Sequence, residues 1–197
     1  CLEDEKYVVA EAAQRERWPG DRNPNSDLAH VRKIFDAALR WSQTLRVDAD
    51  KRSHWREVIG NLSDYPTMVY EDKIVFKEAE NRNQISFFGV GDNPVNFDHV
   101  YPIEALEMQT DEKLRIIARN TVEIMNSWNQ DNAFPRIFSQ AVRAGWPGDD
   151  ILRRFKERIS QNLYPSEILR NNQTIVPHNH GLEAVGAIEF LNSMLAR

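Results

Sequence analysis

The fold class is decided by a stretch near the N-terminus, Asp27-Leu28-Ala29-His30-Val31-Arg32-Lys33-Ile34-Phe35. Its apolar residues recur every three or four positions, which is the spacing of one helix face. Ser26 or Asp27 is suited to cap the helix, because a short polar side chain can accept hydrogen bonds from the first free backbone N–H groups. The same face continues through the following residues and predicts an inward apolar stripe: Val31, Ile34, Phe35, Ala38, Trp41 and Leu45.

Helical spacing returns several times toward the C-terminus. We expect a second helix over 50–62, a third that begins after Thr110 and runs to about Trp128, and others over 134–144, 149–163 and 183–195. Gly145 is suited to end the fourth of these helices. In the last helix the inward residues are expected to be Val185, Ile188, Leu191 and Leu195. The sequence therefore predicts a mainly α fold.

Two other regions break the helical pattern. The first 26 residues are polar and end in a Pro- and Gly-containing tract, which is typical of a loop. Between the helices, 68–70 and 74–76 are β-prone runs that flank Glu71-Asp72-Lys73, which predicts a short hairpin. A further strand is expected over 85–88, followed by a loop over 89–94. The chain thus carries a small β insertion.

The composition excludes several functional classes. The chain of 197 residues has a net charge of -5, with both signs scattered along it, so it offers no basic surface for nucleic acid or anionic membranes. No apolar run approaches the roughly 20 residues that span a bilayer. Cys1 is the only cysteine, so no disulfide can form within the chain. It marks either a processing site or a truncation point.

Familiar catalytic motifs are absent from the sequence. Gly89-Val90-Gly91 lacks the third glycine and the strand-to-helix setting of a nucleotide-binding loop. There is no Gly-x-Ser-x-Gly motif and no internal thiol nucleophile. No spacing typical of metal ligands occurs either, so we expect neither a metal nor another cofactor.

The most distinctive polar segment is Pro177-His178-Asn179-His180-Gly181. His178 and His180 could bind a metal, cap the next helix, or hydrogen-bond sugar hydroxyl groups together with Asn179. His99 and Trp128 lie near helix ends, where an aromatic ring can either contact a sugar or close a core. The residues alone favour the structural alternatives: a helix cap for one histidine of this segment, a structural role for His99 and core closure for Trp128.

Carboxylate groups are too numerous to identify a catalytic pair by counting. Asp98 and Glu183 are the acidic residues nearest the suspected loops. Asp111, Asp149 and Asp150 lie where helix N-termini favour negative charge, so a capping role is expected for them. Hydrolysis of a glycosidic bond requires two carboxyl groups on either side of that bond.

Taken in order, several segments resemble the catalytic domain of glycoside hydrolase family 95, a family related to α-L-fucosidases. The segment 27–35 resembles a helix start of that family, and Trp55-Arg56-Glu57-Val58 through Tyr65-Pro66 resembles its next Trp–Leu–Pro segment. The remaining segments are Asp98-His99-Val100-Tyr101-Pro102, Ile117 to Thr121, Asn132 to Arg136, and His178 through Leu195. The resemblance covers most of residues 27–197.

The resemblance implies part of an (α/α) toroid of the six-hairpin glycosidase type. It also implies metal-free, inverting hydrolysis of a terminal α-L-fucoside or a related sugar, in a secreted, periplasmic or lipoprotein-anchored protein. The chain would supply only the C-terminal portion of this single domain. Its expected partner, besides a carbohydrate substrate, is the N-terminal half of the same domain, which the chain lacks. His99, Trp128, Asn179 and His180 are then expected to bind the sugar, and Glu11 is a candidate general acid.

One departure from the family leaves two rival functions open. The family places a water-activating Asp just before the terminal Asn, whereas this chain has Pro177-His178 before Asn179, so His178 is a candidate base. Loss of that Asp favours a domain that binds glycans without cutting them. A polysaccharide lyase using His99 and Tyr101 is the other rival, and it predicts Arg or Lys side chains around His99.

Overall fold

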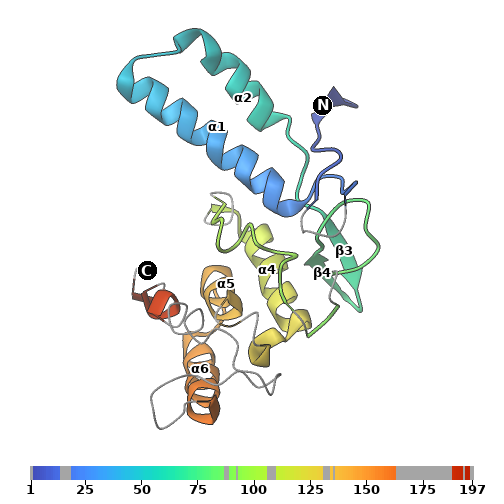
Figure 1. Cartoon of the computed structure of the whole chain (residues 1–197), viewed down its shortest axis with the longest axis vertical. Coiled ribbons are helices and arrows are strands. Elements are labelled where there is room, and N and C mark those ends of the chain that lie inside the picture. The colour runs from blue at the N-terminus through green and yellow to red at the C-terminus, as the bar shows by residue number, and fades with distance from the viewer. Residues whose placement is uncertain are drawn as a thin grey trace.

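The computed structural model describes residues 2–13, 19–86, 89–91, 93–105, 110–130, 134, 136–162, 188–192 and 194–195. The chain is mainly helical with small two-stranded hairpins (Figure 1). The helices are α1 (Asn25–Leu45), α2 (Arg52–Gly60), α4 (Glu112–Met125), α5 (Arg136–Ala144) and α6 (Gly148–Asn162). Short 3-10 helices cover Ala49–Lys51 and Ser127–Asn129, and the strands are β1 (Leu2–Glu3), β2 (Lys6–Tyr7), β3 (Thr67–Tyr70) and β4 (Lys73–Phe76).

The β3–β4 hairpin forms where the sequence predicts it. The strands are antiparallel, with Thr67 opposite Phe76 and Tyr70 opposite Lys73, and Glu71 and Asp72 form the turn. Side chains of α4 bond to the outer edge of β4. Thr121 Oγ1 accepts from the Phe76 backbone N–H at 2.9 Å, and the Asn120 amide donates to the Ile74 carbonyl at 3.1 Å. The helix therefore protects this edge of the hairpin.

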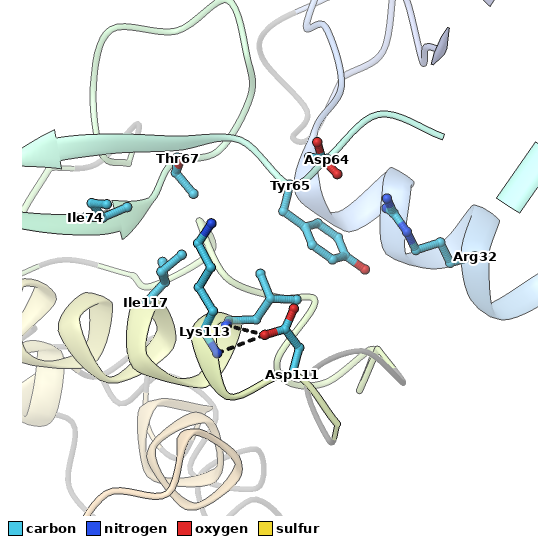
Figure 2. A pocket seen from close by; sticks show the side chains of 9 residues that line it. Arg32, Asp64, Tyr65, Thr67, Ile74, Asp111, Lys113 and Ile117 are labelled. Atoms are coloured by element: carbon cyan, nitrogen blue, oxygen red, sulfur yellow. Dashed lines mark hydrogen bonds between the residues drawn. The ribbon is translucent and has the colours of Figure 1, made fainter. Parts of the chain in front are cut away.

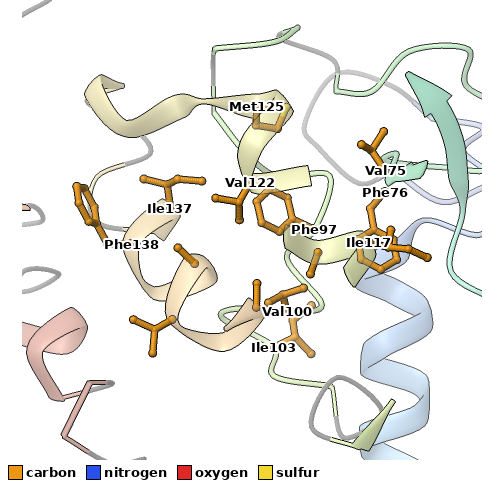
Figure 3. Packing of buried hydrophobic residues seen from close by; sticks show 14 of the residues in the cluster. Val75, Phe76, Phe97, Val100, Ile103, Ile117, Val122, Met125, Ile137 and Phe138 are labelled. Atoms are coloured by element: carbon orange, nitrogen blue, oxygen red, sulfur yellow. The ribbon is translucent and has the colours of Figure 1, made fainter. Parts of the chain in front are cut away.

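The core lies around α4 and α5 (Figure 3). Ile117 and Met125 on α4 are buried between the hairpin and α5, as the helical spacing predicts, and Val122 is buried with them. Seven of the nine residues of α5 are buried. Rings then continue the packing toward α6, where Phe138 lies 5.4 Å from Phe134 and 5.6 Å from Phe155. Apolar burial of this kind is the main stabilising force in a fold of this size.

The hairpin of α1 and α2 extends away from this core (Figure 1). The inward stripe expected for α1 is wrong over its second half. Ile34, Trp41 and Leu45 are 64%, 67% and 69% exposed. The helical period correctly places these residues on one face, but nothing in the described part of the chain covers that face.

The start of α1 also differs from the expectation. The residue at the N-cap position is Pro24, which supplies no side-chain cap, while Ser26 and Asp27 lie inside the helix. Tertiary bonds hold this end instead. The buried Asn25 amide donates to the carbonyls of Lys77 and Asn96, and its backbone N–H donates to the Glu78 carbonyl at 3.1 Å. These bonds fix the base of α1 to the segment after β4.

Three smaller expectations need correction. The first 26 residues are not all loop, because β1 and β2 pair around Asp4 and Glu5, which both have positive φ. Ile85 and Ser86 form no strand; the Ser86 carbonyl instead accepts from Gly89 N–H, which turns the chain. The N-cap of α4 is not Thr110, after which the helix was expected to begin, but Asp111, which confirms the capping role expected for that aspartate.

The described part of the last helix buries a different face from the one expected. Phe190 is fully buried and packs at a tilt against Phe155, with ring centroids 4.6 Å apart. Ile188, Leu191 and Leu195 are 60%, 43% and 83% exposed. Phe190, which lies between Ile188 and Leu191 in the sequence, determines which face of the helix packs against the core. Val185 lies outside the described residues.

Candidate functional site

A pocket of about 460 Å³ lies where α1 meets the N-terminal turns of α4 (Figure 2). We call it the α1–α4 pocket. Its volume is within the range of small-molecule sites, which is roughly 300–1,000 Å³. The described residues that line it come from α1, the segment before β3, the hairpin and α4: Arg32, Asp64, Tyr65, Thr67, Ile74, Asp111, Lys113, Leu114 and Ile117.

The wall on the α1 side is a fixed stack of charged and aromatic groups. Arg32 donates to the Ser63 carbonyl at 2.7 Å, which ties α1 to the segment that leads into β3. Its guanidinium lies 4.6 Å from the centre of the Tyr65 ring, in cation–π range. Tyr65 in turn stacks on His99 with ring centroids 4.4 Å apart. Tyr65 is 7% exposed, so its ring is held within this stack and offers little surface to the pocket.

His99 is the rear layer of this stack and not its surface. It is 0% exposed, and the Phe76 ring meets it edge-on at 4.3 Å. Burial and, to a smaller extent, the positive charge of Arg32 lower the pKa of His99 from 6.5 to about 3. The imidazole is accordingly neutral near pH 7. It is not part of the described pocket lining and packs behind Tyr65.

The opposite wall is the N-terminus of α4. The Asp111 side chain accepts from the backbone N–H groups of Lys113 and Leu114, at 2.8 and 3.3 Å. These bonds satisfy two of the donors that a helix start leaves free. Figure 2 shows the Asp111 carboxylate and the Tyr65 ring facing the same space. One oxygen of Asp111 is thus committed to the helix cap while its side chain still borders the pocket.

The pocket contains two acidic and two basic side chains, Asp64 and Asp111, and Arg32 and Lys113. Asp64 is exposed, in the turn of chain just before Tyr65. Carboxylates on both walls can accept hydrogen bonds from sugar hydroxyl groups, and the Arg32 and Lys113 side chains can donate to them. The arrangement suits a polar ring-shaped ligand.

The other residues predicted for the site do not gather at this pocket. Glu11 is exposed on the N-terminal segment and is not part of the described lining. Trp128 is 4% exposed; it packs on Phe138 and Trp146 and lies 4.6 Å below the Arg154 guanidinium. Asn179, with His178 and His180 on either side, lies outside the described residues, as does Glu183. Their predicted roles stay predictions.

Two carboxylates considered at first have structural partners. Asp98 lies 3.4 Å from Arg136. Asp150, in the first turn of α6, accepts from Trp146 Nε1 at 2.8 Å and from Arg154 at 2.7 Å, and these bonds hold its pKa well below the ordinary value. Asp150 therefore ties the first turn of α6 to Trp146, which lies just before the helix begins.

Sequence reasoning missed the pocket for a physical reason. Asp64 and Tyr65 lie in a short connection, and Asp111 was expected only as a helix cap. Whether these three residues line one pocket depends on how α1 and α4 are placed relative to each other, and no local sequence pattern encodes that placement. The available signal was Tyr65-Pro66, a conspicuous aromatic residue directly before the hairpin.

A second pocket, of about 400 Å³, lies beside the hairpin. We call it the hairpin pocket. Its described lining consists of Met68, Tyr70, Asn83, Gln84, Ile85, Ser86, Gly89 and Val90.

The described ranges contain neither a metal site nor a membrane-spanning helix. No three His, Cys, Asp or Glu side chains there come close enough to hold a metal ion. None of the helices described is both long and apolar enough to cross a bilayer. No protein-family model matches the sequence, and no curated protein matches it.

Proposed function

We propose that this chain is part of a glycoside hydrolase of the helical-toroid class and that a terminal sugar, an α-L-fucoside or a related one, occupies the α1–α4 pocket. The observation that carries the proposal is the presence of Asp64 and Asp111 in the lining of one pocket, together with Arg32 and Lys113. Inverting hydrolysis uses one carboxyl group to protonate the leaving oxygen and another to activate water. These two aspartates are the carboxyl groups of the described lining.

The exposed stripe of α1 supports the toroid part of the proposal. In a ring of paired helices, each helix packs against neighbours on both sides. Ile34, Trp41 and Leu45 form an apolar face of the kind that further helices of a ring would cover. The stripe thus favours a larger helical assembly over an isolated α1–α2 hairpin.

Binding without hydrolysis is the second candidate, and the capping role of Asp111 favours it. An aspartate that bonds to Lys113 and Leu114 N–H groups contributes to the stability of α4. Asp64 would then be the single carboxyl group of the described lining without a structural task, which suffices to orient a sugar but not to cut its bond by the two-carboxylate route.

The lyase alternative receives partial support from Arg32. That guanidinium is close enough to His99 to lower its pKa further, which meets the expectation of a basic group near this histidine. Complete burial of His99 argues against its use as the base, since a catalytic base must approach the proton that it abstracts. Tyr101 is not among the described residues of the pocket.

The decisive experiment compares Asp64→Asn with Asp72→Asn, a change at an exposed aspartate in the β3–β4 turn. Hydrolysis of an aryl α-L-fucoside should fall roughly 10²–10⁴-fold in Asp64→Asn, the usual contribution of an acid–base group, and stay unchanged in Asp72→Asn. Equal activity of both variants would overturn the hydrolase assignment to this pocket. Fucose binding without turnover in the unmodified chain would establish the binding-only alternative.

A further inference from the structure

The two pockets lie on opposite faces of the β3–β4 hairpin. Thr67 lines the α1–α4 pocket, whereas the next residue, Met68, and Tyr70 line the hairpin pocket. Successive residues of a strand point to opposite faces, so this alternation separates the two sites by the thickness of the hairpin. The hairpin pocket is therefore a site of its own and not an extension of the first.

The hairpin pocket has no charged residue in its described lining. This contrasts with the α1–α4 pocket, where four of the nine described lining residues are charged. Charged residues make up 28% of the chain, yet none is among the eight described residues of this lining. The lining therefore disfavours charged ligands. A charged ligand would lose hydration here with no counter-charge to replace it.

Neutral hydrogen-bonding groups replace the charges. Asn83 and Gln84 are exposed at this pocket, and within the described residues neither side chain is engaged in a hydrogen bond. Each amide offers a carbonyl acceptor and two N–H donors. Adjacent hydroxyl groups of a sugar ring, which both donate and accept, match such a pair.

The apolar part of the pocket has a floor and an aromatic side. Ile85 is 3% exposed and forms the floor, and the half-buried Tyr70 comes from β3. Val90, which is 45% exposed, stands at the rim. An aromatic face combined with free amides and no charge is suited to the mixed polar and C–H surface of a saccharide.

We propose that the hairpin pocket is a second saccharide site, which binds a neutral sugar through Tyr70, Asn83 and Gln84 on the side of the hairpin opposite the α1–α4 pocket. The inference does not rest on hydrolysis at the first pocket, because the two linings share no described residue. An extended peptide that pairs with β3 is the competing occupant; it would use backbone bonds and depend little on the side-chain amides.

The test measures saturation transfer from the full chain to D-galactose and D-glucose, with D-glucuronate as the charged probe. Gln84→Ala and Tyr70→Ala should each weaken binding of the neutral sugar by roughly tenfold, the cost of losing one hydrogen-bonding or stacking partner. Gln43→Ala, a change at an exposed glutamine on α1, should leave it unchanged.

A further variant protects the test against loss of folding. Gln84→Glu changes only an exposed side chain and removes the two N–H donors of the amide, so the fold should persist while binding of the neutral sugar falls. Binding that survives both changes at Gln84 would overturn the proposal. So would transfer to D-glucuronate as strong as to neutral sugars, binding of a Val- and Thr-rich tetrapeptide in their place, or no transfer at all.

Discussion

Helices α1 and α5 show two different uses of an amphipathic helix. The nine residues of α5 include seven that are buried, and its rings interlock with α6. By contrast, α1 has 21 residues, of which four are fully buried: Asn25, Leu28, Ala29 and Ser42. The α1–α4 pocket lies at the junction of these regions. Binding sites at the edge of a dense core can adjust to a ligand without disturbing the core.

The largest effect expected from this contrast is the loss of a core ring. Phe138 is fully buried and contacts four other aromatic residues: Trp128, Phe134, Phe155 and Phe190. We expect Phe138→Ala to lower the free energy of unfolding by about 3–5 kcal/mol, as measured by urea denaturation. A loss below about 1 kcal/mol would mean that the aromatic cluster does not carry the stability of the fold.

Acid should destabilise the stack behind the pocket. The pKa of His99 is about 3 in the folded chain and near 6.5 when unfolded, so below pH 6.5 the unfolded state takes up a proton that the folded state refuses. Between pH 6.5 and 3, stability should fall by about 1.4 kcal/mol per pH unit from this group. His99→Phe should flatten that part of the profile. An unchanged slope would contradict the burial of His99.

The helix cap at the pocket should have an intermediate effect. We expect Asp111→Ala to cost about 1 kcal/mol, because two backbone N–H groups of α4 lose their acceptor. Asp111→Asn retains an acceptor oxygen and should restore most of that stability. If both variants unfold at the same urea concentration as the unmodified chain, the cap contributes little and Asp111 is available for another role.

The smallest effect on stability is expected on the exposed stripe of α1. Trp41 is 67% exposed, so Trp41→Ser should change the free energy of unfolding by less than about 0.5 kcal/mol. It should, however, reduce self-association of the chain at high concentration, since it removes the largest ring of the stripe. Light scattering that is identical for both proteins would show that the stripe is not adhesive.

The sequence predicts local structure well and tertiary contacts poorly. The hairpin follows from two β-prone runs around a short turn, and α4, α5 and α6 follow from their apolar spacing. Spacing cannot show whether a face is covered, which is why the inward stripe of α1 was wrong. It also cannot weigh one large ring against several aliphatic side chains, as Phe190 demonstrates.

The candidate site was less predictable than the fold. His99 and Trp128 have the residue types of a sugar site, yet both are buried among other rings. Asp64 and Asp111 are 47 positions apart in the sequence. They line the same pocket only because the fold brings the segment before β3 close to the start of α4. Chemical type is thus readable from the sequence, whereas access to solvent is a property of the assembled fold.

The central claim is that the α1–α4 pocket holds a sugar ring, and a titration with L-fucose monitored by backbone amide NMR tests it most directly. The Lys113 and Leu114 amides, which donate to Asp111 at the pocket wall, should shift progressively and saturate. Amides of α6, remote from the pocket lining, should stay in place. Saturating shifts confined to other regions, or none at all, would contradict the claim.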